Sequence, residues 1–201
     1  MRNNIFLLSI AASAVIYCIC KEMTAAALLA VLIPVLAHEL GHVAVLLLLK
    51  SKISGFAVEP RGLCIQYSGV LSESAEIAAA LSGPAAGMLY ALMLRGFSLY
   101  NSCRFFQLSS DMSLLLSLFN FLPVLPLDGG TALLHLSGMF LDEYAAEKLC
   151  FLTSLVFSCL ILLAGLIMML RGRGQTLLAA GLWLAICQSE NRGIVKKQKV
   201  L

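Results

Sequence analysis

Three side chains suited to a metal site lie within five consecutive residues, His38-Glu39-Leu40-Gly41-His42. The surrounding stretch, AVLIPVLAHELGHVAVLLLLK, is otherwise apolar and predicts a helix. Residues four apart lie on one helical face, so His38 and His42 can offer two imidazoles to one ion. Glu39 stands beside them and can reach a water molecule as general base without binding the metal. The H-E-x-x-H pattern therefore predicts one bound Zn²⁺ with a base next to it.

The composition places this motif in a membrane. Of the 201 residues, 60% are hydrophobic and only 12% charged, about half the charge of an ordinary soluble domain. Ionisable side chains within an apolar span are costly and by default functional. A proton-relay or packing cluster of His and Glu is the alternative interpretation of the same three residues. The net charge of +3 is too small to indicate a nucleic-acid partner.

Tetrahedral zinc needs a third protein ligand, and three residues in or near spans are candidates: Asp111, Asp128 and His135. Asp128 lies near the end of the segment NFLPVLPLDGG, residues 120–130, whose prolines and glycines should break a helix. Unwound backbone at membrane depth is tolerated only where it is buried or lines a cavity. Such a segment could turn a carboxylate toward the metal.

Apolar runs predict an all-α polytopic membrane protein with about six transmembrane helices in one membrane-embedded domain, residues 1–201. The first run resembles a signal peptide, but a retained span is the preferred interpretation. The seven cysteines fall mostly in apolar stretches and are interpreted as structural. The predicted spans cover residues 4–20, 24–49, 75–95, 105–127, 149–170 and 175–189.

A small membrane-associated β-hairpin is predicted after the second span, at residues 53–69. Apolar residues there alternate on either side of Glu59-Pro60-Arg61-Gly62, a pattern typical of two strands and a turn. Its open edge could pair with an extended peptide. An ordinary loop packed on the helices is an equal alternative.

Loop charges predict the orientation. With both termini cytoplasmic, nine basic residues lie on that side and five on the other, as the positive-inside rule favours. Spans two and four then both run inward, which places His42 roughly 12 Å from the cytoplasmic end of its span. Asp128 comes at the same end, so the active site is expected toward the cytoplasm.

Because of these two motifs, the chain resembles the site-2 protease family of intramembrane zinc metalloproteases. Members carry H-E-x-x-H in one span and N-x-x-P-x-x-P-L-D-G in a later one, and residues 38–42 and 120–129 match both patterns. The resemblance implies that His38, His42 and Asp128 bind zinc and that Glu39 activates water. It implies that Asn120 lies near the substrate or the developing oxyanion.

Other features place the chain within that family and mark departures from it. Six spans without a PDZ or CBS domain resemble the bacterial branch that includes the sporulation pro-sigma-factor processing proteases, although that branch usually has a CBS domain. Gly83 and Gly87 resemble a small-residue motif in which we expect a helix-packing role. Many members have Arg where Thr131 stands.

The expected activity is hydrolysis of peptide bonds in membrane proteins or membrane-associated peptides. The lipid bilayer is the expected environment, and a regulatory membrane protein of unknown identity is a further possible partner. Two alternatives stay open: a non-proteolytic metal-binding membrane protein or transporter, and a zinc hydrolase acting on lipid or another membrane amide. Glu39 discriminates the first, since a transporter needs no base beside its ligands.

Overall fold

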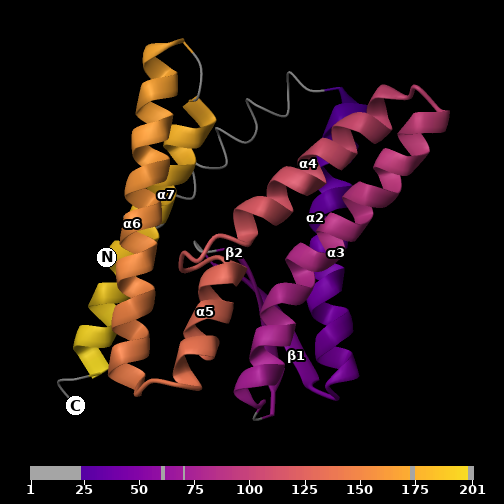
Figure 1. The fold of residues 1–201 in the computed structure, drawn as a ribbon. Helices are drawn as coiled ribbons and strands as arrows, with labels where there is room; N and C mark the ends of the chain where they lie inside the picture. The colour runs from indigo at the N-terminus through magenta and orange to yellow at the C-terminus, as the bar shows by residue number, and fades with distance from the viewer. Residues whose placement is uncertain (1–23, 60–61, 70, 173–174, 199–201) are drawn as a thin grey trace.

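The computed structural model describes residues 24–59, 62–69, 71–172 and 175–198 (Figure 1). This part of the chain is mostly helical, as predicted, with one antiparallel pair of strands. The span predicted for residues 4–20 lies outside the described residues. The elements are, in chain order, α2 (Ala25–Leu48), β1 (Lys52–Glu59), β2 (Gly62–Ser68), α3 (Glu73–Tyr100), α4 (Arg104–Asn120), α5 (Asp128–Gly138), α6 (Glu143–Leu170) and α7 (Gln175–Gln198).

The helices form two groups joined by the shortest one (Figure 1). In the first group, α3 packs against both α2 and α4. In the second, α6 and α7 pack against each other as a helical pair. Between the groups, α5 contacts α3 on one side and α6 on the other.

Three of the described helices, α2, α3 and α6, are long and apolar enough to cross a bilayer. They coincide with the second, third and fifth predicted spans. At the fourth and sixth predicted spans the helices are shorter: α4 has 17 residues, and the apolar part of α7 covers residues 175–188.

A change of backbone direction after α2 starts the hairpin. Lys50 adopts the left-handed conformation with φ of 58°, and the N–H groups of Lys50 and Ser51 donate to carbonyls in the last turn of α2 at 2.9 and 3.0 Å. These two bonds form a Schellman motif, which ends the helix and satisfies its carbonyls. The strands β1 and β2 then pair with Ile53 opposite Tyr67 and Phe56 opposite Ile65, so the predicted hairpin is confirmed.

The fourth predicted span was too long. Helix α4 ends at Asn120, seven residues before the predicted boundary at 127, because Pro123 and Pro126 cannot continue a helix. Helix α5, which begins at Asp128, was not predicted from the sequence. Asp128 therefore lies at the first position of a separate helix rather than at the end of the fourth span.

Close packing of α3 and α4 depends on small and hydroxylated residues. The hydroxyls of Ser110 and Ser113 donate to the carbonyls of Ala91 and Gly87, at 2.8 and 2.7 Å. A Cβ atom on Gly87 would collide with the Ser117 hydroxyl. The expected packing role of Gly87 is thus confirmed.

Candidate metal centre

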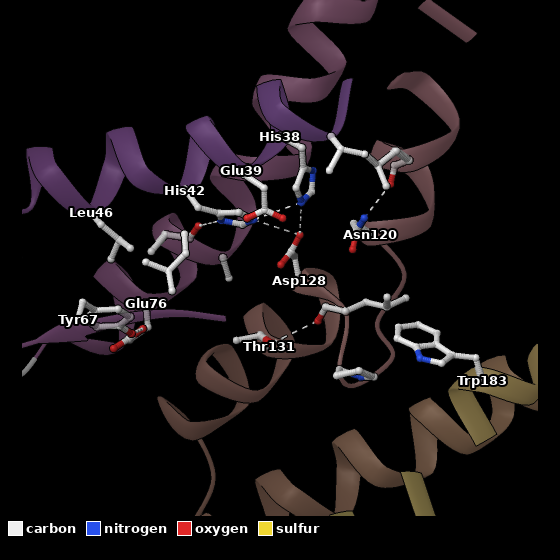
Figure 2. Close-up of a pocket in the computed structure, with 17 residues that line it drawn as sticks. His38, Glu39, His42, Leu46, Tyr67, Glu76, Asn120, Asp128, Thr131 and Trp183 are labelled. Carbon is white, nitrogen blue, oxygen red and sulfur yellow. Dashed lines mark hydrogen bonds and ion pairs between the residues drawn. The ribbon is translucent and has the colours of Figure 1, made fainter. Parts of the chain in front are cut away.

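The H-E-x-x-H motif occupies the middle of α2 and faces a pocket of about 330 Å³ (Figure 2). His38 is buried, with 5% of its surface exposed, and Glu39 and His42 are half-buried. The helix supplies the geometry expected from the sequence, because the two imidazoles, one turn apart, meet edge to face with their Nε2 atoms 3.3 Å from each other.

Two glycines bring α2 and α3 together at this point. A Cβ atom on Gly41 would come within 2.6 Å of the Ser82 carbonyl oxygen and the Ala86 side chain. A Cβ atom on Gly83 would collide with the ring of His42. Both glycines are therefore needed for the distance at which α3 meets the site.

This close approach lets the backbone of α3 orient the ring of His42. Nδ1 of His42 lies 2.8 Å from the carbonyl oxygen of Ala79 and donates to it, since a carbonyl can only accept. In the neutral imidazole the lone pair then lies on Nε2, which faces the pocket. The hydroxyl of Ser82 donates to the same carbonyl at 2.6 Å.

Asp128 enters the pocket from the start of α5 and points at the two histidines (Figure 2). Its Oδ2 atom lies 3.1 Å from Nε2 of His38 and 3.4 Å from Nε2 of His42. With the 3.3 Å between the two nitrogens, the three atoms form a nearly equilateral triangle. Residues from two separate helices, about 90 positions apart in the chain, thus converge on one point.

The residues fit a tetrahedral cation. Ligands about 2.0–2.1 Å from a central zinc ion stand about 3.3–3.4 Å apart along a tetrahedral edge, close to the observed sides of the triangle. Nε2 of His42 and Oδ2 of Asp128 are both acceptors, so they cannot satisfy each other. Among the described residues, Oδ2 of Asp128 has no hydrogen-bond donor although it is buried. A cation between the three atoms resolves this convergence of lone pairs.

Glu39 completes the arrangement. It lines the same pocket, and its carboxylate lies beside the three converging atoms (Figure 2). Glu39 is not one of the three residues whose atoms form the triangle. A carboxylate so placed can accept a proton from a water molecule held in the pocket.

Asn120 lies across the pocket from α2, at the last position of α4. Its Nδ2 atom donates to the carbonyl oxygen of Leu116 at 3.0 Å, one turn back in the same helix. The amide oxygen is directed toward the pocket (Figure 2). One of its two N–H groups is therefore used within α4, and the other is available to a ligand.

The other two candidate ligands lie elsewhere. Asp111 is exposed and accepts from Arg95 of α3 at 3.3 Å. His135, two turns beyond Asp128 on α5, pairs through Nδ1 with Glu73 of α3 at 2.8 Å. Of the three residues considered for the third ligand, only Asp128 joins the histidines in the described part of the chain.

The sequence analysis missed several residues that border the site. The closeness of Gly83 to His42 and of the Ala79 carbonyl to Nδ1 depends on how two helices cross, which no local pattern reveals. Glu76 of α3 lines the pocket and accepts from the hydroxyl of Tyr67 at 2.6 Å. Ile65 and Tyr67 of β2 also line the pocket, so the hairpin borders the site.

Comparison with known proteins identifies the fold. A solved structure of a site-2 protease from Methanocaldococcus jannaschii matches with a TM-score of 0.69 at 20% sequence identity, over 92% of this chain and 86% of that one. At this identity the similarity establishes a site-2-protease-like fold. No protein-family model matches the sequence, and no curated protein matches it either.

Proposed function

We propose that this protein is an intramembrane zinc metalloprotease that hydrolyses peptide bonds of membrane-embedded or membrane-associated substrates. The observation that carries the proposal is the triangle of His38, His42 and Asp128 with Glu39 beside it, in a pocket among apolar helices. The fold shared with a solved site-2 protease supports it.

His38 and His42 through Nε2 and Asp128 through Oδ2 would hold the metal. Zinc bound there would supply Lewis acidity, which polarises a carbonyl and makes water a nucleophile near neutral pH. The Glu39 carboxylate accepts the proton of the attacking water and returns it to the nitrogen of the leaving amine. The bond broken is the peptide C–N bond, and the products are a carboxylate and an amine.

The remaining pocket residues would hold the substrate. A peptide from a transmembrane helix must unwind before its carbonyl can reach the metal, so it needs other hydrogen-bond partners. The hairpin borders the pocket through Ile65 and Tyr67 and could pair with an extended peptide. The available N–H of Asn120 would contact the substrate or the developing oxyanion.

The proposed location is the cell membrane, with several spans, cytoplasmic termini and the metal centre toward the cytoplasm. Three described helices with the length and composition of membrane spans support the membrane setting. The orientation depends on the loop charges. The proposed partners are the bilayer, the membrane substrate and a regulator that remains to be identified.

Replacing Glu39 with Gln tests the proposal. The purified Glu39→Gln protein should bind one zinc ion, as the unmodified protein does, because Glu39 is not a ligand. The same protein in membranes should retain uncleaved substrate, which can be captured with it and identified. Glu147→Gln, a matched change at an exposed position of α6, should cleave the captured substrate normally.

The result also separates this function from the alternatives. Continued cleavage by Glu39→Gln would show that Glu39 is not the base. A non-proteolytic metal-binding protein or transporter would bind zinc in both forms and process no membrane protein in either. A lipid or amide hydrolase would release its product without shortening any captured protein.

A further inference from the structure

The chain between α4 and α5, residues 121–127, brings Asp128 to the site without regular secondary structure. Its backbone N–H groups are accounted for almost entirely within the same stretch of chain. Phe121 and Leu122 donate to carbonyls of α4 at 3.0 and 3.2 Å, and Val124 and Leu127 donate within the segment at 2.7 and 2.8 Å. The two prolines carry no N–H.

Leu125 is different. Its N–H donates to the hydroxyl oxygen of Ser154, on α6, at 2.9 Å. Among the backbone N–H bonds described for residues 121–127, this is the one whose acceptor belongs to a helix other than α4. Ser154 is 1% exposed, so its hydroxyl is shielded from solvent. Leu125 precedes Asp128 by three residues, and the bond therefore fixes the chain just before the proposed ligand.

Helix α7 contacts Ser154 through a hydrogen bond to its backbone carbonyl. Nε2 of Gln188, on α7, donates to the backbone carbonyl of Ser154 at 2.9 Å and to the hydroxyl of Ser158 at 2.6 Å. Gln188 is 7% exposed and Ser158 is 2% exposed. Both hydrogens of the amide are used, so Gln188 links α7 to two successive turns of α6.

Apolar packing holds the same segment at the same place. Val124 and Leu127 are buried against Leu184 of α7, with Trp183 beside them. Trp183 also lines the metal pocket. Apolar contacts alone allow a segment to slide, whereas a hydrogen bond to one N–H fixes its register.

We propose that Ser154, held by Gln188, is a positioning residue that fixes Asp128 for metal binding through the N–H of Leu125. The inference rests on the proposed metal site and goes beyond it, since neither side chain touches the metal or the substrate. Without the hydroxyl, the Leu125 N–H loses its acceptor on α6, and the segment would shift to find another. Such a shift moves Asp128 relative to His38 and His42.

Zinc affinity of the full-length protein in detergent, measured by competition with a chelator, tests the inference. We expect Ser154→Ala to bind zinc about tenfold more weakly, the size typical of changes behind a ligand. Replacing zinc with Co²⁺ should give a visible absorption spectrum that differs from that of the unmodified protein, which general loosening of the fold would not produce. Gln188→Met should show a smaller change in the same direction and serves as a second variant if Ser154→Ala does not fold.

Ser113→Ala is the matched control. Ser113 is fully buried, and its hydroxyl donates to the backbone carbonyl of Gly87 across the α3–α4 interface rather than to residues 121–127. It should bind zinc with unchanged affinity even if its melting temperature falls. Equal affinity in Ser154→Ala and the unmodified protein, or equal weakening in Ser154→Ala and Ser113→Ala, would overturn the inference. Absence of zinc binding in the unmodified protein would instead overturn the proposed metal site.

Discussion

The two sides of the candidate metal centre are built in opposite ways. On one side, His38 and His42 stand on a continuous helix, and their separation follows from helical geometry. On the other, Asp128 follows a segment with two prolines and no regular structure. Contacts with other helices determine where the segment lies, through Ser154 and the cluster around Val124.

The difference indicates which changes each side tolerates. The histidine side depends on how closely α3 approaches α2, because Gly83 lies against the ring of His42 and the Ala79 carbonyl orients that ring. The aspartate side depends on the backbone path of residues 121–127, because these residues form no helix that would fix the position of Asp128. Steric changes should therefore act most strongly at the helix crossing, and changes in hydrogen bonding should act most strongly at the segment.

Gly83→Ala should have the largest effect. Its new Cβ atom would overlap the ring of His42, and neither helix backbone can move away without losing the Gly41 contact. We expect zinc affinity to fall by about 100-fold or more and proteolysis to be lost. Gly96→Ala, in the same helix with open space around it, should leave zinc affinity unchanged and stabilise α3 slightly. Normal zinc binding by Gly83→Ala would show that the two helices are not held at this distance.

Gly129→Ala should have the next largest effect. A Cβ atom there would collide with the carbonyl of Phe121 and lie 2.6 Å from that of Leu122, so the segment before Asp128 would have to move. We expect zinc affinity to fall by about 10- to 100-fold. Gly138→Ala, at the other end of α5, meets only an ordinary contact with Glu73 at 3.8 Å and should bind zinc normally. If both variants retain full affinity, the segment is more adaptable than its packing suggests.

The same contrast explains what the sequence could predict. The pairing of His38 with His42 could be predicted because helical periodicity alone brings residues four apart together. The hairpin could be predicted because alternating apolar residues and a segment with Pro60 and Gly62 are local signals. Its two strands are confirmed. Asp128 was named among three candidates, and the family resemblance singled it out before the structure brought it to the histidines.

What the sequence could not predict depends on tertiary contacts. Ser154 and Gln188 are polar residues within apolar stretches, and nothing in their neighbourhood indicates that they meet each other or Leu125. The length of the fourth span was overestimated because its apolar character continues through Pro123 and Pro126. Helix α5 is short, and its apolar residues alone do not separate it from the preceding span.

The smallest effect is expected from an ion pair that links the two sides directly. Glu73, in the first turn of α3, pairs with His135 near the end of α5, with 52% and 27% of their side chains exposed. Exposed pairs contribute little, so we expect Glu73→Gln to weaken zinc binding by no more than about fivefold. Asp111→Asn breaks the pair between Arg95 of α3 and Asp111 of α4, whose side chains are more exposed, at 61% and 62%, and should leave zinc affinity unchanged. A larger loss in Glu73→Gln than in Gly129→Ala would mean that α3, rather than the segment before Asp128, determines where the third ligand lies.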